Sequence, residues 1–352
     1  MKYYFYKKEK KDIVPVVDEQ VNSEAKAKVE ELLKSPKEHN IPSWILSCKE
    51  IALFQSKGNL AKANALYIAD KECVYDMGNT LNDLTSKEWL PETVTVFAQK
   101  GLGACSSEAQ IEKLHPAPYS YQDVARHIRF FTKEGDYVLD PFVGVGSTLK
   151  AACVEGRRGL GIELNPKYAE LSKLRIETEL PLLMEYKNQQ ETICGDSLTV
   201  LKTLQDDTFD FVMTSPPYWN ILDTVDSKAK QREEAELDTK YSESENDLAN
   251  ISDYNTFLGK LTDVFIECGR VLKNGKYIAI VVSDFRKSEK YYMFHSDLAA
   301  MLEERSSFVL KGIKILYQRH KSIYPYGYPF SFVPNVHHQY ILILRNEKNG
   351  KK

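Results

Sequence analysis

The tetrapeptide Ser215-Pro-Pro-Tyr218 is the part of this sequence whose residue types point most directly to chemistry. Its two prolines fix the backbone and remove two N–H donors, so the carbonyl groups around Ser215 and Pro216 can point rigidly into a pocket as acceptors. An exocyclic amino group needs such acceptors for its hydrogens and a planar surface for its ring, so that its nitrogen lone pair can face an electrophile. We therefore predict that Ser215, Pro216, Pro217 and Tyr218 form a catalytic group, and a proline-rich turn with a core tyrosine is the alternative.

Residues 138–148 have the composition of a nucleotide-binding turn. Their sequence, Val-Leu-Asp-Pro-Phe-Val-Gly-Val-Gly-Ser-Thr, runs from an expected strand through a glycine-rich bend into an expected helix. Gly144 and Gly146 permit a tight turn and the close approach of a ligand, and free N–H groups at a helix start favour an anionic group. Glu163 ends the next expected strand, where a carboxylate can accept both ribose hydroxyls. Asp196 follows a third strand and can accept an adenine amino group, with a plain turn as the alternative.

A glycine turn followed by an acid also occurs in nicotinamide-binding folds, where the acid lies about 20 residues further on. The turn in this chain reads Asp-Pro-Phe-x-Gly-x-Gly and lacks the third glycine that lets a helix pack closely against a dinucleotide. A nicotinamide-dependent oxidoreductase therefore remains an alternative that the details of the turn disfavour.

These residues need a parallel sheet to bring them together. From about residue 121 the sequence alternates short apolar strand patterns with helix patterns, which is typical of an α/β fold with a doubly wound, mostly parallel sheet. The expected strands cover 137–140, 160–163, 191–194, 209–214 and 277–282, with helices from about 147, 166, 198, 254 and 296. Residues 308–317 and 338–344 predict a C-terminal antiparallel hairpin. Because open α/β sheets bind ligands at the carboxyl ends of their strands, we expect the glycine turn and the Ser-Pro-Pro-Tyr segment on one rim.

Length and composition indicate a globular protein with two parts. The chain has 352 residues, 43% of them hydrophobic, and a net charge of −3. We expect residues 114–352 to form the catalytic domain, and residues 1–113 to form a smaller, mainly helical region that is a candidate for target recognition. A polar insertion at 223–253 holds ten acidic against four basic residues and is expected to be a mobile loop.

Composition also limits the partners. No apolar run is long enough to span a bilayer, and the charged start of the chain does not resemble a secretory signal, so we expect a cytoplasmic protein without a membrane partner. The six cysteines are widely spaced and show no metal-ligand pattern, so no metal is expected. Without a global positive charge, any nucleic-acid surface must be a local patch. The candidate patch mixes basic and aromatic residues, with a solvated strand edge as the alternative: Lys311, Lys314, Arg319, Lys321 and Tyr324.

Taken together, the motifs resemble those of the amino-methyltransferases of bacterial restriction-modification systems, which act on cytosine N4 or adenine N6 in DNA. The resemblance runs from about residue 114 to 345. Residues 140–148 are similar to the family's cofactor motif, Thr214-Ser-Pro-Pro-Tyr218 to its catalytic motif, and His115-Pro-Ala-Pro-Tyr119 to the segment beside the methionine part of the cofactor. The resemblance implies a Rossmann-like fold and S-adenosyl-L-methionine as cofactor. It implies these contacts: His115, Pro116, Asp140, Phe142, Gly144, Gly146, Thr148, Glu163 and Asp196.

The same resemblance implies DNA as the substrate and a restriction endonuclease as a candidate partner. Serine at the start of the catalytic motif is more usual among cytosine N4 enzymes, so we favour cytosine N4, with adenine N6 as the alternative. The cofactor motif precedes the catalytic motif, the reverse of the commonest order with serine, and this leaves the place of the target-recognition region open. An RNA or protein amino-methyltransferase, which more often has Asn or Asp before the prolines, and a DNA-binding protein without activity remain further alternatives.

Overall fold

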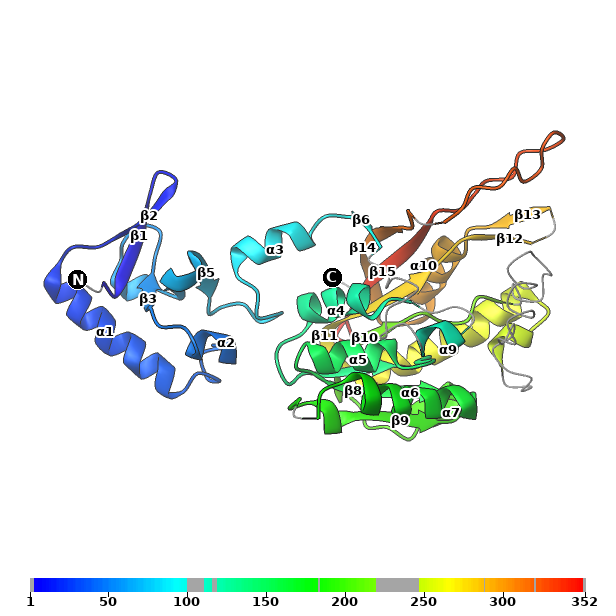
Figure 1. Ribbon diagram of the computed structural model, residues 1–352, viewed down its shortest axis with the longest axis horizontal. Helices are drawn as coiled ribbons and strands as arrows, with labels where there is room; N and C mark the ends of the chain where they lie inside the picture. Colours follow the sequence, from blue (N-terminus) through cyan, green and yellow to red (C-terminus); the bar gives the residue numbers. More distant parts are fainter. Residues whose placement is uncertain are drawn as a thin grey trace. The chain divides into compact units, whose positions relative to one another are not determined.

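The computed structural model describes residues 3–99, 111–115, 119–182, 184–219, 247–287, 289–319 and 321–350 (Figure 1). The chain divides into two compact units. The first comprises Met1–Val94 with Arg129–Glu134, and the second comprises Thr95–Ile128 with Gly135–Lys352. Each unit has a sheet and a hydrophobic core of its own.

The second unit contains an eight-stranded sheet in the order β6-β14-β15-β11-β10-β7-β8-β9. Neighbouring strands from β11 to β9 are parallel, whereas β15 runs antiparallel to both β11 and β14. The predictions of a mostly parallel α/β sheet and of a C-terminal antiparallel hairpin are therefore confirmed. In sheet order the strands are β6 (Val96–Ala98), β14 (Phe308–Tyr317), β15 (His338–Asn346), β11 (Leu272–Val282), β10 (Phe209–Thr214), β7 (Tyr137–Asp140), β8 (Arg158–Glu163) and β9 (Gln190–Cys194).

Helices cover both faces of this sheet. Helices α5 and α6 pack against β8 and β9 over one apolar cluster, while α7 and α10 each pack on α9 over the larger core. Helix α9 shows why the sequence forms such a layer, because its buried residues Phe257, Leu261, Phe265 and Cys268 recur at helical spacing. The helices of this part are α4 (Tyr121–Phe131), α5 (Ser147–Val154), α6 (Pro166–Glu179), α7 (Ser197–Leu201), α9 (Tyr254–Val271) and α10 (Phe294–Arg305). A small separate hairpin consists of β12 (Phe285–Lys287) and β13 (Lys290–Tyr292).

The first unit is built around a five-stranded sheet, so the prediction of a mainly helical N-terminal region was wrong. Its order is β2-β1-β3-β4-β5. Ile51–Phe54 and Ala65–Ile68 are short, almost wholly buried strands, and such apolar runs cannot be told from helix segments by periodicity. The elements are β1 (Phe5–Glu9), β2 (Asp12–Pro15), α1 (Glu19–Lys34), α2 (Ser43–Leu46), β3 (Ile51–Phe54), β4 (Ala65–Ile68), β5 (Cys73–Asp76) and α3 (Ser86–Glu92).

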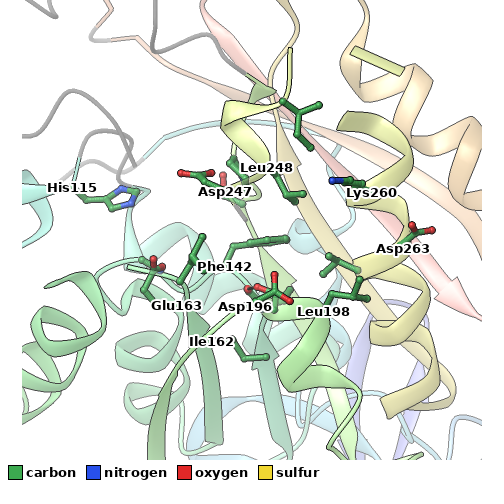
Figure 2. A pocket seen from close by; sticks show the side chains of 18 residues that line it. His115, Phe142, Ile162, Glu163, Asp196, Leu198, Asp247, Leu248, Lys260 and Asp263 are labelled. Carbon is green, nitrogen blue, oxygen red and sulfur yellow. Dashed lines mark hydrogen bonds between the residues drawn. The ribbon is translucent and has the colours of Figure 1, made fainter. Parts of the chain in front are cut away.

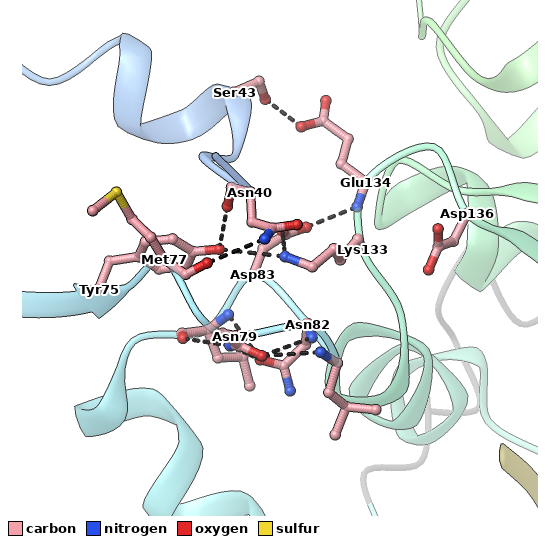
Figure 3. A network of polar contacts seen from close by, with 12 residues as sticks. Asn40, Ser43, Tyr75, Met77, Asn79, Asn82, Asp83, Lys133, Glu134 and Asp136 are labelled. Atoms are coloured by element: carbon pink, nitrogen blue, oxygen red, sulfur yellow. Dashed lines mark hydrogen bonds and ion pairs between the residues drawn. The ribbon is translucent and has the colours of Figure 1, made fainter. Parts of the chain in front are cut away.

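A polar network explains why Arg129–Glu134 belongs to the first unit (Figure 3). Asp83 accepts a hydrogen bond from the Glu134 amide at 2.7 Å through Oδ2, and its Oδ1 lies 3.6 Å from the Lys133 Nζ. Nearby, the Nδ2 of Asn82 donates to the Phe130 carbonyl at 2.6 Å. These contacts tie the last turn of α4 and the residues after it to the loop that follows β5.

Within the described part of the chain, every helix is too short or too polar to cross a membrane. The same described residues contain no group of three or more His, Cys, Asp or Glu side chains that could hold a metal ion.

Candidate cofactor and catalytic site

A cavity of about 350 Å³ lies at the carboxyl ends of the parallel strands of the second unit (Figure 2). Four neighbouring strands each contribute a lining residue where they end: Phe142 after β7, Glu163 at the end of β8, Asp196 after β9 and Ser215 after β10. Because carboxyl ends of parallel strands meet along one edge, residues far apart in the sequence face the same space. The structure thus places the glycine turn and the Ser-Pro-Pro-Tyr segment on one rim, as the sequence predicted.

The two glycines of the turn serve different purposes. Both have left-handed backbones, with φ of 53° at Gly144 and 84° at Gly146. A Cβ on Gly144 would meet the His115 Nε2 at 3.3 Å beside the cavity, which both residues line. A Cβ on Gly146 would instead meet the Ser172 Oγ of α6 at 2.6 Å. Gly146 therefore permits the turn to pack on a helix, and it does not line the cavity as a ligand contact would require.

Glu163 presents a carboxylate that the backbone holds in place. Its Oε2 accepts a hydrogen bond from the Gly144 amide at 2.9 Å, and its Oε1 accepts one from the Asn165 amide at 2.8 Å. Burial raises the pKa of Glu163 to about 7, against the lowering effect of these two bonds. A carboxylate has about four acceptor positions, so two remain for the hydroxyls of a ribose.

Asp196 and Phe142 complete the nucleoside-like part of the cavity. The Oδ2 of Asp196 caps α7 by accepting from the Thr199 amide at 2.8 Å and from its hydroxyl at 2.7 Å, so both bonds leave Oδ1 for a ligand. The Phe142 ring lies across the middle of the cavity in Figure 2, above Ile162. Two carboxylates beside an aromatic ring and an apolar wall fit a nucleoside cofactor, whose ribose and base need acceptors and a flat surface.

Asp140 lies beneath the turn and not in the cavity wall. Its side chain is fully buried, and burial raises its pKa. Oδ1 accepts from the Thr214 hydroxyl at 2.6 Å and the Phe142 amide at 3.0 Å, while Oδ2 accepts from the hydroxyls of Tyr119, at 2.8 Å, and Thr148. The structure therefore gives Asp140 and Thr148 internal partners where direct cofactor contact was expected. Their side chains fix the end of β7 to the end of β10 and the start of α5.

The Ser-Pro-Pro-Tyr segment, which was predicted to be catalytic, contributes Ser215 and Pro217 to the cavity lining, whereas Pro216 is buried. Tyr218 stands beside the cavity with its ring edge-on to Phe294 at 6.2 Å. Its hydroxyl accepts a hydrogen bond from the Gln339 Nε2 at 2.9 Å, and burial raises its pKa. The next residue, Trp219, donates from Nε1 to the Ile251 carbonyl at 2.7 Å and so anchors the segment.

Two groups of residues near this rim escaped the sequence analysis. Asp247, Leu248 and Ile251 form the cavity wall opposite the glycine turn together with residues of α9. They lie near the end of the polar insertion at 223–253, and the signal that could have revealed them is the pair of apolar residues, Leu248 and Ile251, in an otherwise polar stretch. Residues 223–246 of the insertion lie outside the described residues, as does Pro116.

The second group is a carboxylate and a histidine at the end of β11. Asp284 is almost fully buried, and its Oδ1 lies 2.7 Å from the His295 Nδ1. The His295 ring stacks on Tyr340, with 3.7 Å between ring centroids. Because β11 is the parallel neighbour of β10, Asp284 follows the strand beside that of Ser215. An acid just after an apolar strand was the signal that singled out Asp196, and the same rule would have found Asp284.

The basic patch predicted around Lys311 does not form a single surface. Lys311 makes an ion pair with Glu347 at 2.6 Å, and Lys314 is buried on the inward side of β14. Lys321 donates from Nζ to the Val336 carbonyl at 3.2 Å. Arg319 and Tyr324 are exposed, and so is Lys311 despite its ion pair, so the buried Lys314 interrupts the predicted patch.

The order of the strands, the helices on both faces and a nucleoside-sized cavity at the carboxyl ends define the Rossmann-like methyltransferase fold. A family model described as DNA methylase, for N6 and N4 methyltransferases, matches residues 1–174 and 209–352. The chain belongs to this family of DNA amino-methyltransferases, as its motifs predicted. The class depends on S-adenosyl-L-methionine, which was the predicted cofactor.

Individual relatives match over shorter stretches. The chain is 36% identical over 97 residues to the type II methyltransferase M.BglI of Bacillus subtilis, and 43% identical over 106 residues to M2.DpnII of Streptococcus pneumoniae. These matches cover 28% and 30% of this chain but only 26% and 36% of the two relatives. Among solved structures, TTHA0409 from Thermus thermophilus, complexed with S-adenosyl-L-methionine, aligns with a TM-score of 0.31 and 24% identity over 45% of this chain and 54% of that chain.

Proposed function

We propose that this chain is a DNA methyltransferase that methylates the exocyclic amino group of a flipped-out base, with cytosine N4 as the favoured target. The observation that carries the proposal is that one cavity is lined both by Glu163 and Asp196 and by Ser215 and Pro217. A methyl donor held by the first pair and an amine held by the second would share the same space. Membership of the DNA methylase family supports DNA as the substrate.

The chain's own residues would hold the cofactor by its nucleoside part. The Phe142 ring packs on the adenine, the free acceptor positions of Glu163 take the ribose hydroxyls, and Asp196 accepts the adenine amino group. His115, across from Gly144, borders the end where the methionine part would lie. When bound, S-adenosyl-L-methionine supplies an electrophilic methyl group.

The catalytic segment would orient the amine. The Ser215 side chain and the carbonyl of Pro216 accept the two amine hydrogens, so that the nitrogen lone pair is directed at the methyl carbon. The Tyr218 ring offers a face for the base. The bound cofactor would supply the methyl group that this nitrogen takes, with the cofactor's thioether as the leaving group, and one of the two amine protons held by Ser215 and Pro216 would pass to water. Positioning accounts for such a step without a covalent intermediate on the protein.

The proposal also covers the target base, the roles of the two parts of the chain and a partner protein. Serine in the catalytic motif favours cytosine N4, and adenine N6 is the alternative outcome. We assign residues 114–352 to catalysis, which the cavity supports because its described lining lies in the second unit. We assign residues 1–113 to target recognition. A restriction endonuclease is a further candidate partner, and copurification with the tagged chain would test it.

The decisive experiment is expression of the chain in a host without DNA methylation, followed by genome sequencing that separates N4-methylcytosine from N6-methyladenine. We expect one short sequence motif to carry N4-methylcytosine. Ser215→Ala should abolish the modification, and Ser23→Ala, an exposed serine on α1, should leave it intact. A genome without any modified motif would overturn the proposal, and N6-methyladenine would select the alternative target.

A further inference from the structure

We propose that the loop joining β14 to β15 is a DNA-binding element that stacks aromatic rings on the bases beside the flipped target. This aromatic finger comprises residues 321–337 and extends from the sheet as the orange-red loop of Figure 1. The inference rests on the proposed function, because it assigns the surface by which the same site would engage its duplex.

The finger exposes large apolar side chains that a folded protein normally covers. Tyr328 is 81% exposed, Phe330 93% and Phe332 90%, with Ile323 beside them at 78%. Single apolar residues on a surface need no explanation, but a contiguous group on one loop marks an interaction site. Flat rings held out into solvent are suited to stacking on nucleic-acid bases, each of which has an aromatic face.

The finger is an ordered loop with hydrogen bonds of its own. Across its stem, the Tyr324 amide donates to the Asn335 Oδ1 and the Asn335 Nδ2 donates to the Tyr324 carbonyl, both at 2.9 Å. At its tip, the amides of Phe330 and Ser331 both donate to the Gly327 carbonyl at 2.7 Å. Gly327 has a φ of 76°, and a Cβ there would meet the Ser331 carbonyl oxygen at 2.2 Å. These bonds fix the backbone that carries the rings, which lowers the entropy cost of binding.

Charge favours a polyanion as the occupant. Residues 319–337 include Arg319, Lys321 and two histidines but no Asp or Glu, although the whole chain has 50 acidic residues. A segment that is free of acids and carries basic residues at its base can approach phosphates without repulsion. Aromatic rings next to basic groups are the combination that proteins use for nucleic acid.

The position of the finger in the sheet also favours DNA as its ligand. β14 and β15 end their pairing at Tyr317 and His338, and Tyr340 pairs with Val282 at the carboxyl end of β11. Since β11 is parallel to β10, the finger leaves the sheet at the rim from which Ser215 faces the cavity. A duplex that has one base in the cavity would therefore present the neighbouring steps to this side, where an inserted ring can fill the vacated stack.

The test uses the full chain and a duplex containing the motif found methylated in the expression host. Fluorescence anisotropy at several salt concentrations gives the affinity and its salt dependence. Phe330→Ala and Phe332→Ala should each weaken binding by roughly 5- to 150-fold, the range expected from the loss of one base–aromatic stack, without changing the salt slope. Phe330→Trp should keep wild-type affinity, while Phe330→Leu should behave as the alanine variant, because it keeps apolarity without a flat ring.

Two controls separate stacking from charge and from general apolar effects. Arg319→Gln should lower the salt slope by about one, as expected for one lost phosphate contact. Leu182→Ala, which changes an apolar side chain that is 88% exposed elsewhere on the chain, should change neither quantity. Unaltered thermal unfolding of the finger variants would show that the fold is retained.

Three outcomes count against the proposal. If the motif is methylated but every finger variant binds the duplex within about twofold of wild type, the finger is not a DNA contact while the proposed function stands. If the variants keep their DNA affinity but change the oligomeric state in light scattering, the finger is an interface between copies. If no motif is methylated and the chain has no affinity for DNA, both the proposed function and the proposed role of the finger are wrong.

Discussion

The Nε2 of Gln339 donates a hydrogen bond to the hydroxyl of Tyr218 at 2.9 Å and joins the C-terminal hairpin to the Ser-Pro-Pro-Tyr segment. Gln339 is itself held by its neighbour, because the Gln318 Nε2 donates to its Oε1 at 3.3 Å and also to the Gln99 Oε1 at 3.1 Å. A row of amide side chains thus runs across the edge of the sheet to the tyrosine, and it restricts the plane in which the ring can lie.

This row predicts a positioning role for Gln339. Gln339→Leu removes the donor and leaves the Tyr218 hydroxyl without this partner, a loss typically worth about 1 kcal/mol. We expect kcat for DNA methylation to fall roughly 2- to 10-fold while the affinity for S-adenosyl-L-methionine is unchanged, as single-turnover kinetics and calorimetry would show. Gln189→Leu, at an exposed glutamine, is the matched control. A loss of cofactor affinity equal to the loss of kcat would point to general disruption of the site.

Glu163 predicts a pH dependence of cofactor binding. Its pKa of about 7 means that the carboxyl is largely protonated at pH 6 and largely ionised at pH 8. The ionised form is the better acceptor for ribose hydroxyls, so calorimetry should show tighter binding of S-adenosyl-L-methionine at pH 8. Glu163→Gln should bind more weakly at pH 8 and lose most of this dependence. Equal affinity of the wild-type protein at both pH values would contradict the assignment.

The same group affects stability in the opposite direction. Burial raises the pKa of Glu163 in the folded chain above its usual value of 4.5, so the folded state binds more protons than the unfolded state between about pH 4.5 and 7. The contribution of Glu163 to the free energy of unfolding is therefore present at low pH and is lost as the pH rises through this window. Without cofactor, the Glu163→Gln variant should gain stability relative to wild type as the pH rises from 5 to 8 in urea titrations.

Asp140 predicts a stability effect at the junction below the cavity. Thr214→Val keeps the side-chain shape but removes the hydroxyl that donates to the Asp140 Oδ1 at 2.6 Å. Because the acceptor is a fully buried carboxyl, we expect the free energy of unfolding to fall by about 1–3 kcal/mol in urea titrations. Thr203→Val, at an exposed threonine, should change it by less than about 0.5 kcal/mol. Equal effects of the two variants would show that the buried bond contributes little.

Asp83 predicts that the polar network stabilises the first unit. Asp83→Ala removes the acceptor of the Glu134 amide and the partner of Lys133. The cost should be about 0.5–1.5 kcal/mol in the unfolding free energy, the usual net contribution of one hydrogen bond, because Glu134 is exposed and its amide can turn to water. Asp12→Ala, at an exposed aspartate of β2, is the matched control. Hydrogen exchange should rise at Glu134 in the Asp83 variant alone, and unchanged exchange there would count against the network.

Sequence patterns predicted the parallel strands of the second unit well, because the central ones are buried on both faces. Phe209–Thr214 is apolar almost throughout and is a strand with the predicted bounds, as is Tyr137–Asp140. The same rule failed in the first unit, where the four-residue apolar run Ile51–Phe54 shows no period. Tyr137–Asp140 is equally short but runs into the glycine-rich turn, so the residues after the strand, and not its length alone, separated the two cases.

The candidate site was predictable to the extent that its residues follow strands. Glu163, Asp196 and Ser215 were found because each ends or follows an apolar run, and the sheet brings them together. The pairing of Tyr218 with Gln339 could not be found, because it depends on a contact between residues 121 positions apart. Lys314 was misplaced because it shares the inward face of β14 with Leu316, where the two-residue period of a strand buries it.

Asp140 also has a consequence for how the cavity can move. One carboxyl fastens the last residue of β10 to the first turn after β7, so the two walls of the cavity share a single support. A shift of either wall that displaced this group would expose buried hydroxyls on both sides at once. Opening and closing of the cavity should therefore come from the segments above the rim, while the strand ends below it stay a rigid floor.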